Sequence, residues 1–206
     1  MIYWGTPRFI IRLLKKFEWH GNRSEKTIHI TFDDGPTPEI TDKVLDILDE
    51  YDARATFFCL GRNVDRHPEL FQKIKQRGHA TGNHTYSHLR GWKASLKSYI
   101  QDVNLAQQLI RSKLLRPPYG RISSAQARYL GKQYRIIMWD VLTHDYNRRL
   151  PKEMCLRNVI RGTKNGSIIV FHDSKKASET MLYILPKYLE HFSNEGYTFK
   201  RIEGDS

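Results

Sequence analysis

Two adjacent carboxylates, Asp33 and Asp34, stand at the end of an alternating apolar run and just before a Gly-Pro break. The alternation over residues 28–33 predicts a β-strand with one buried face. Because neighbouring negative charges repel, the pair indicates a bound cation or a transferred proton rather than a contribution to folding. The alternative is that the two acids cap the next helix, but Thr37 and Pro38 are expected to begin that helix as N-cap and first helical residue.

The segment NHTYSHL supplies His84 and His88, four positions apart. On a helical turn both imidazoles would project to the same side and could share a metal ion, although many such pairs are incidental. Adding one of the two aspartates gives a site of two histidines and a carboxylate, which leaves coordination positions open for water and substrate. The other aspartate would stay free as a general base. Nitrogen and oxygen donors favour zinc, with cobalt, nickel, manganese or iron as other candidates.

Two more segments carry side chains suited to catalysis. In FHD, His172 ends a buried strand and could protonate a leaving group, with its pKa raised by a carboxylate such as Asp145. The alternative is an ordinary surface histidine. In RPPYG, residues 116–120, two prolines fix the backbone, so that the N–H of Tyr119 could face an oxyanion. Taken alone, this loop predicts only a turn.

The positions of these residues depend on a regular succession of strands and helices. Strand patterns occur at residues 28–33, 55–60, 79–83, 114–116, 134–142, 167–172 and 197–202, with helical periodicity between most of them. Alternating strands and helices predict a parallel sheet, open or closed. Six ionisable residues fall at the carboxyl ends of strands, which open on one face in a parallel barrel. They are Asp33, Asp34, His84, Arg116, Asp145 and His172. The topology would therefore gather them into a single mouth.

Composition restricts the class of protein. The chain has 206 residues, 39% of them hydrophobic, which predicts a soluble globular protein with a sizeable core. The formal charge of +12 favours anionic partners, but the basic residues are scattered and form no nucleic-acid motif, so no nucleic-acid partner is expected. The two cysteines, Cys59 and Cys155, indicate neither a disulfide framework nor a cysteine metal site. No Gly-rich dinucleotide fingerprint follows a strand.

The N-terminal residues 1–25 are expected to form a lead-in that contains an amphipathic helix over residues 8–17. This helix would either cover a flank of the domain or lie on an anionic membrane as a peripheral contact. No apolar run is long enough to span a membrane, and Arg8 and Arg12 interrupt any secretory signal. The sequence therefore predicts a cytoplasmic or peripheral membrane location, and it gives no indication of oligomeric state.

The segments TFDDGP, HTYSH, RPPYG, WDVLTHDY and VFHD resemble, in this order, the five motifs of the polysaccharide deacetylases, also called carbohydrate esterase family four or NodB-like domains. ATFFCLG at residues 55–61 resembles the second strand of that family. The resemblance covers roughly residues 26–200 and implies a distorted, incomplete (β/α) barrel with about seven parallel strands. The expected catalytic domain spans residues 26–206.

The resemblance also implies a role for each motif residue. The metal ligands would be Asp34, His84 and His88. Asp33 would be the catalytic base, and Arg116 would hold and orient its carboxylate. His172 would be the general acid, Asp145 the carboxylate that adjusts the pKa of His172, and Tyr119 the donor to the oxyanion. Substrate contacts would come from Pro118, Tyr119, Tyr146 and Phe171. Tyr146 stands where the family often has tryptophan, and Phe171 where it commonly has leucine.

The function implied is metal-dependent removal of acetyl groups from N-acetylated amino sugars of peptidoglycan or a chitin-like glycan. The same machinery would also suit an O-acetyl ester of xylan or a cyclic amide. A different class of protein, a catalytically silent carbohydrate- or membrane-binding module, is a further alternative. A glycosidase is disfavoured because its two carboxylates must flank one bond, whereas Asp33 and Asp34 are adjacent. Members of the family usually act outside the cytoplasm, which contrasts with the location predicted above.

Overall fold

The computed structural model describes residues 4–204, without the side chain of Arg8. Its strands are β1 (Thr27–Asp33), β2 (Thr56–Cys59), β3 (Ala80–Asn83), β4 (Leu114–Leu115), β5 (Arg135–Ile136), β6 (Val141–Leu142), β7 (Ile168–His172) and β8 (Thr198–Phe199). Its helices are α1 (Arg8–Leu13), α2 (Ile40–Glu50), α3 (Gly61–Arg66), α4 (Pro68–Gln76), η1 (Gly91–Lys93), α5 (Leu96–Ile110), η2 (Pro118–Gly120), α6 (Ser124–Leu130), α7 (Lys152–Gly162) and α8 (Ser178–Asn194).

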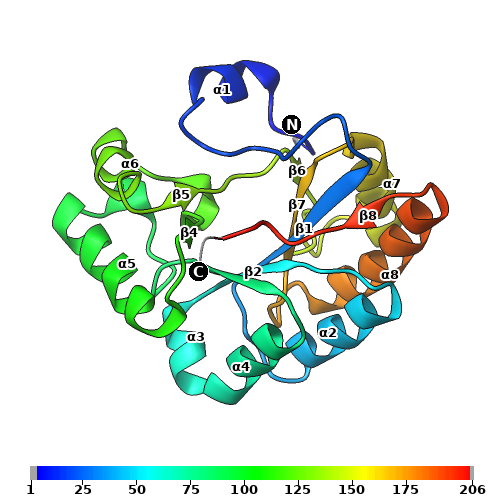
Figure 1. Ribbon diagram of the computed structural model, residues 1–206, viewed down its shortest axis with the longest axis horizontal. Helices are drawn as coiled ribbons and strands as arrows, with labels where there is room; N and C mark the ends of the chain where they lie inside the picture. The colour runs from blue at the N-terminus through cyan, green and yellow to red at the C-terminus, as the bar shows by residue number, and fades with distance from the viewer. Residues whose placement is uncertain (1–3, 205–206) are drawn as a thin grey trace.

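The strands form one curled parallel sheet in the order β5-β4-β3-β2-β1-β7-β6, and β8 pairs with the start of β1. Helices α2 to α8 lie around the outside of this sheet (Figure 1). The prediction of an incomplete (β/α) barrel with about seven parallel strands is confirmed. In the pairing register, Asp33 lies beside Phe58 of β2 and His172 of β7. The carboxyl ends of the central strands are therefore level with one another.

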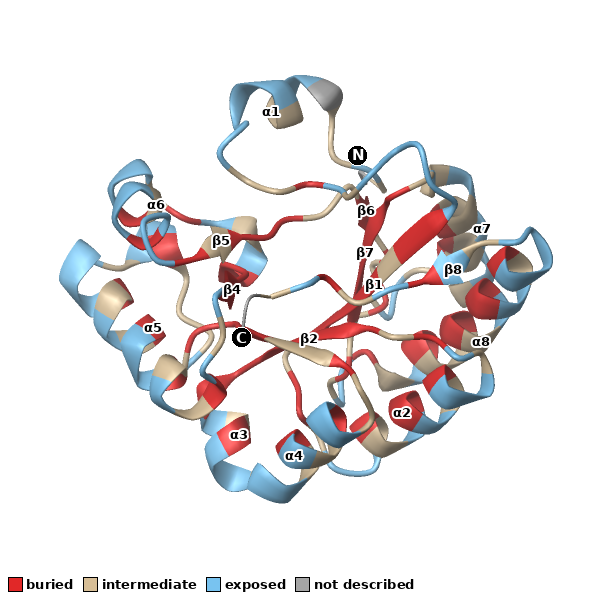
Figure 2. Ribbon diagram, viewed as in Figure 1, coloured by how far each residue is buried: buried red, intermediate tan, exposed pale blue. Residues whose placement is uncertain are grey.

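Burial explains why the sheet is rigid at its centre. Ile28, Ile30 and Phe32 of β1 are fully buried, and the ring of Phe32 lies between Phe57 and Phe171, with centroid distances of 4.9 and 5.7 Å. Aromatic contacts of this kind add about 0.5–1.5 kcal/mol each to the burial of apolar area. Figure 2 shows the central strands buried and the outer faces of the surrounding helices exposed. β1, which leads into the aspartate pair, is thus packed against β2 on one side and β7 on the other.

Two details of the predicted elements are wrong. The expected strand over residues 134–142 is two short strands, β5 and β6, because the intervening backbone leaves β4 and crosses to β7, where the Asp140 N–H donates to the Ile168 carbonyl. The helix expected to begin at Pro38 begins at Ile40 instead, after Glu39 with φ 66°. Thr37 does not cap it, since the N-cap residue is Glu39 and no side chain makes a capping hydrogen bond there.

The N-terminal segment reaches the sheet by two routes. Residues Ile10, Ile11 and Phe17 pack against a core cluster that includes Ile136 and Met138. Residues further along form isolated bridges, Glu18 with Ile137 and His20 with Ser167. The helical part of the predicted 8–17 segment is limited to α1. Within residues 4–204, the structure contains no helix with the length and apolar character needed to cross a membrane.

Candidate active site

The aspartate pair is separated by a sharp change in backbone direction. Asp33 is the last residue of β1, whereas Asp34 has φ 81°, a left-handed conformation that is uncommon outside glycine. The turn is held by a hydrogen bond from the Gly35 N–H to Asp173 Oδ1 (3.0 Å) and by Asn63 Nδ2 donating to the Asp34 carbonyl (2.7 Å). The two carboxylates therefore face different partners although they are adjacent in sequence.

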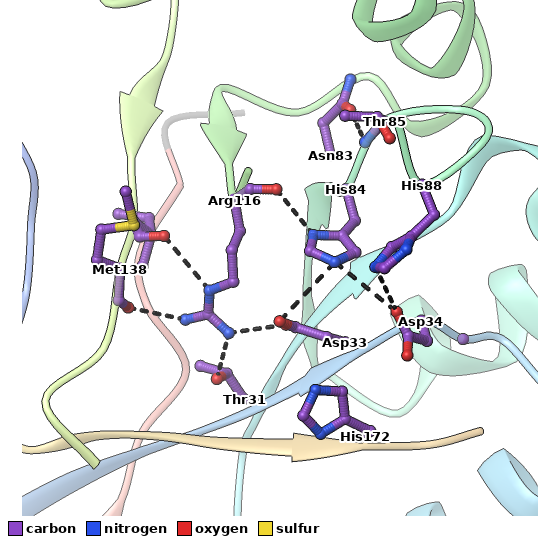
Figure 3. Close-up of polar contacts among 12 residues, drawn as sticks. Thr31, Asp33, Asp34, Asn83, His84, Thr85, His88, Arg116, Met138 and His172 are labelled. Carbon is purple, nitrogen blue, oxygen red and sulfur yellow. Dashed lines mark hydrogen bonds and ion pairs between the residues drawn. The ribbon is translucent and has the colours of Figure 1, made fainter. Parts of the chain in front are cut away.

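Asp33 is held by Arg116, which follows β4. The Arg116 guanidinium donates to Asp33 Oδ1 at 2.8 Å and to Thr31 Oγ1 at 2.6 Å, and it also donates to the carbonyls of Ile137 and Met138. Figure 3 shows these contacts around the guanidinium. Arg116 is fully buried, and burial lowers its pKa while Asp33 opposes that effect. Asp33 Oδ2 is not used by the ion pair with Arg116 and lies 3.9 Å from His84 Nε2.

His84 and His88 lie in a loop, not on the helical turn predicted for them. The backbone of this loop is left-handed at Thr85 (φ 66°) and at His88 (φ 63°), and the carboxylate of Asp102 accepts hydrogen bonds from the N–H groups of Tyr86 and Ser87. Both imidazoles nevertheless face the aspartate pair (Figure 3). The prediction that they converge is confirmed, but its geometric reason is a strained and anchored loop.

Asp34, His84 and His88 form a group of three possible metal ligands. Asp34 Oδ1 is 3.2 Å from His88 Nε2 and 3.8 Å from His84 Nε2. This oxygen is buried and accepts no hydrogen bond, which is costly unless a cation occupies the space between the three side chains. Two imidazole nitrogens and one carboxylate oxygen suit a catalytic divalent metal with open coordination positions. The residues present therefore fit the metal that the sequence predicts.

The protonation states of these residues agree with metal binding. His84 Nδ1 donates to the Arg116 carbonyl at 2.7 Å, which leaves Nε2 with a lone pair directed at Asp34. Burial lowers the pKa of His84 to about 4, so the ring is neutral at physiological pH. For Asp34, burial tends to raise the pKa, but the imidazoles of His88, His172 and His84 outweigh it and lower the pKa. A neutral imidazole and an ionised carboxylate are the forms that bind metal.

His172 is paired with a buried carboxylate on the other side of the aspartates. Its Nδ1 lies 2.7 Å from Asp145 Oδ1, and its backbone N–H donates to Asp145 Oδ2 at 2.8 Å. Burial alone would lower the pKa of His172, but Asp145, helped by Asp34 and Asp33, raises it to about 9. The imidazole is therefore protonated at neutral pH. Since Nδ1 faces Asp145, Nε2 is the nitrogen left to protonate a substrate.

The RPPYG segment presents a backbone donor beside the metal ligands. Tyr119 has φ 60° and Gly120 has φ 63°, so the chain turns sharply after the two prolines. Within the described chain, no acceptor is present for the Tyr119 N–H. The Tyr119 ring contacts that of His88 at a centroid distance of 4.6 Å. The Tyr119 N–H is thus left without a protein acceptor on a loop whose ring contacts His88.

These groups surround one pocket of about 650 Å³. Its lining includes Asp33, Asp34, His84, His88, Tyr119, Tyr146 and His172, all of which the sequence pointed to. Arg116 and Asp145 lie behind it as buried supports. Pro118 does not line the pocket, and neither does Phe171, whose ring packs in the core against Phe32 and Tyr188. Strand alternation places Val170 there instead.

Several pocket residues were not singled out from the sequence. Trp139, Leu142, Val170 and Asn63 also line the pocket. Trp139 and Leu142 lie within the WDVLTHDY segment, which marked the region without indicating those two positions. Asn63 belongs to α3, and no local signal distinguishes it from an ordinary helical asparagine. Such residues become visible only when the fold brings α3 to the mouth of the sheet.

The chain is similar to proteins of known class. The sequence model described as polysaccharide deacetylase matches residues 20–136. A peptidoglycan-N-acetylglucosamine deacetylase of Bacillus cereus is 34% identical over 189 residues, with 88% of each chain covered. The peptidoglycan-N-acetylmuramic acid deacetylase PdaC of Bacillus subtilis is 34% identical over 161 residues, which cover 75% of this chain but 34% of PdaC.

The fold has a close counterpart among solved structures. The crystal structure of the Bc1960 peptidoglycan N-acetylglucosamine deacetylase superimposes with a TM-score of 0.85 at 29% identity, covering 96% of this chain and 95% of that one. The similarity therefore extends over nearly the whole chain, including all strands that carry the site. By its sequence motifs, its curled parallel sheet and these relatives, the chain belongs to the polysaccharide deacetylase family.

Proposed function

We propose that this protein is a metal-dependent hydrolase that removes acetyl groups from the N-acetylated amino sugars of peptidoglycan. The names of its relatives support the substrate class, since they include deacetylases of N-acetylglucosamine and of N-acetylmuramic acid. The observation that carries the proposal is the grouping of Asp34, His84 and His88 around a buried oxygen without a hydrogen bond. A carboxylate and a protonated imidazole flank that group in one pocket.

Asp34, His84 and His88 would hold the cation. When bound, a divalent metal acts as a Lewis acid that polarises the acetyl carbonyl and lowers the pKa of water from about 15.7 toward about 7. Asp33 would take the proton of the attacking water through Oδ2, because Arg116 fixes Oδ1 at 2.8 Å while Oδ2 has only the more distant His84 Nε2 at 3.9 Å. Arg116 thereby orients the base without contacting the substrate.

Two other groups would complete the hydrolysis of the amide bond. The free N–H of Tyr119 would donate to the oxygen of the acetyl group as negative charge develops on it. His172, protonated because Asp145 raises its pKa to about 9, would pass its Nε2 proton to the departing amine. The C–N bond then breaks, and acetate and the free amino sugar leave. Asp145 would hold the imidazole in place and does not itself transfer the proton.

The first experiment is to measure metal content and acetate release from N-acetylglucosamine oligomers and from peptidoglycan, before and after chelation and after return of zinc or cobalt. We expect activity to be lost on chelation and restored by metal. Asp34→Ala should lose both metal and activity. Asp33→Asn should keep the metal but lose turnover by about 10²–10⁴-fold, since it removes a general base.

The controls separate this proposal from its alternatives. Asp52→Asn changes an exposed carboxylate away from the pocket and should leave both the metal content and the rate of acetate release unchanged. Acetate release by metal-free protein would contradict the proposal, as would full activity of Asp33→Asn. Release from O-acetylated xylan but from no N-acetylated sugar would assign the site to ester chemistry. Glycan binding without acetate release from any substrate would favour a silent binding module.

We also propose that residues 8–17 contact an anionic membrane surface. In this segment Phe9 is 70% exposed and Leu13 is 79% exposed, while Ile10 and Ile11 pack against the domain. Arg12, Lys15 and Lys16 are exposed as well. Exposed apolar side chains bordered by cationic ones match the interface of a bilayer with anionic lipids.

A further inference from the structure

Four cationic side chains are among the residues that line the active-site pocket: Arg62, Arg90, Arg121 and Lys176. We call these four residues the cationic rim. They come from four separate places in the chain, namely α3, the loop before η1, the residue after η2, and the loop after β7. Within residues 4–204, none of the four side chains forms an ion pair or a hydrogen bond, so their donors are free.

Aromatic rings hold three of these cations in place. The guanidinium of Arg90 lies 4.4 Å from the ring centroid of Tyr119, and that of Arg121 lies 5.0 Å from the ring of Trp92. Lys176 Nζ lies 5.5 Å from the ring of Tyr146. Stacking orders a guanidinium while leaving its N–H groups directed outward, which prepares it to bind an anion with little loss of entropy.

The rings under Arg90 and Arg121 are both largely exposed rather than buried in the core. Tyr119 is 52% exposed and Trp92 is 64% exposed, and the Trp92 Nε1 donates to the Ile122 carbonyl, which fixes its orientation. A solvated basic surface explains single lysines and arginines on helices. It does not explain two guanidinium groups stacked on exposed rings at the same opening. The arrangement instead resembles a prepared recognition surface for a planar anion.

The charge of the rim is not compensated inside the pocket. The only carboxylates among the lining residues are Asp33 and Asp34. Asp33 is already paired with buried Arg116, and Asp34 faces the two imidazoles of the metal site. Arg148 and Arg149 line a groove that adjoins the pocket and shares Lys176 and Tyr146 with it. The approach to the reacting centre is therefore positive along the mouth.

We propose that the cationic rim binds carboxylate groups of the glycan, so that the enzyme prefers an acidic N-acetylated strand to a neutral one. The inference rests on the proposed deacetylase function and adds the substituent by which the substrate is selected. In peptidoglycan such a carboxylate has two sources, the lactyl ether of the muramic acid ring and the attached stem peptide. Arg90 and Arg121 are the central residues, because a guanidinium donates to a carboxylate through two parallel N–H bonds.

The test compares the KM for acetate release on four glycans. They are neutral N-acetylglucosamine oligomers, peptidoglycan strands freed of peptide with the lactyl carboxylates exposed, the same strands with these carboxylates converted to methylamides, and strands that retain stem peptides. We expect the unaltered protein to show a KM about tenfold lower for the carboxylate strands than for the methylamide strands, the value of one hydrogen-bonded charge. Added salt should reduce this ratio.

The variants assign the preference to the rim. Arg90→Gln with Arg121→Gln should bring the KM ratio close to one, whereas Arg128→Gln with Arg157→Gln, two exposed arginines on α6 and α7, should leave it as it is. A preference that appears only with stem peptides would assign the carboxylate to the peptide. The inference would be overturned if the carboxylate strands and the stem-peptide strands both had the same KM as the methylamide strands in the unaltered protein. An unchanged KM ratio in the Arg90 and Arg121 double variant would also overturn it.

A binding measurement keeps this test separate from the proposed catalytic function. Calorimetric titration of Asp33→Asn with the same carboxylate, methylamide and stem-peptide strands measures how tightly each strand binds when no turnover takes place. If the unaltered protein releases no acetate from any glycan while Asp33→Asn binds the carboxylate strands about tenfold more tightly than the methylamide strands, the deacetylase proposal fails and the rim stands. If the unaltered protein releases acetate but Asp33→Asn binds the carboxylate, methylamide and stem-peptide strands equally tightly, the rim fails and the deacetylase stands.

Discussion

Arg116 is the buried cation that determines where Asp33 lies. Its guanidinium is fully buried and donates to Asp33, Thr31 and two backbone carbonyls. Arg116→Met would leave the Asp33 carboxylate buried without a counter-charge. We expect this change to lower the free energy of unfolding by about 3–5 kcal/mol, measured by urea denaturation. Arg128→Met, an exposed change on α6, should stay within about 0.5 kcal/mol; equal midpoints for the two variants would contradict the expectation.

The carboxylate of Asp145 controls the charge on His172. With the pKa of His172 raised to about 9, the imidazole carries its proton below that pH and loses it above. Asp145→Asn removes the negative charge, so the pKa of His172 falls and the proton is lost at lower pH. We expect the alkaline limb of the kcat/KM profile to move down by about one to three pH units. Asp52→Asn is the control, and an unmoved limb in Asp145→Asn would exclude His172 as the acid.

Backbone strain at the site explains part of what the sequence could not predict. Asp34, Thr85, His88, Tyr119 and His144 all have positive φ values between 55° and 81°. These residue types rarely adopt that conformation, and none of them marks a turn as glycine would. The sequence indicated which side chains meet, because strand ends converge. The loops that bring them into contact depend on tertiary hydrogen bonds, such as that between Gly35 and Asp173.

At the scale of elements, the apolar periodicity predicted where regular strands lie, but it did not predict where the chain crosses from one part of the sheet to another. The strands β2, β3, β4, β7 and β8 lie inside the ranges that the apolar pattern predicts. The apolar run over residues 134–142 predicted one strand because the pattern carries no sign of the crossing between β4 and β7. The cationic rim was equally hidden, since its residues lie in four segments that only the fold brings together.

The N-terminal helix gives a prediction about membranes. If α1 inserts its exposed apolar side chains, Phe9→Ser with Leu13→Ser should weaken sedimentation with vesicles of phosphatidylcholine and phosphatidylglycerol by about tenfold or more, from the apolar area lost. Leu96→Ser with Leu105→Ser, exposed leucines of α5 at 42% and 46%, is the matched control. Equal sedimentation of the two double variants, or none with the unaltered protein, would contradict a membrane role for α1.

At the scale of the whole molecule, the N-terminal segment takes part in closing the sheet. The two edge strands, β5 and β6, are consecutive in the chain, and residues 137–140 join them. Glu18 bridges to Ile137 in this connection, with its N–H donating to the Ile136 carbonyl and its own carbonyl accepting from the Met138 N–H. The carbonyls of Ile137 and Met138 are also acceptors for Arg116. Glu18 therefore pairs with the same short connection, residues 137–140, whose carbonyls bind Arg116, and Arg116 in turn holds Asp33.

The order of the strands also has a consequence for synthesis on the ribosome. β1 ends at Asp33, directly before Asp34, yet it pairs with β7 and β8, which are translated last. Asp34, His84 and His88 all lie in the first half of the chain, whereas His172 ends β7. A nascent chain released before β7 would therefore contain all three candidate metal ligands beside an unpaired edge of β1. We expect such fragments to capture metal without catalysing hydrolysis, and to require chaperones, because an exposed central strand is prone to aggregation.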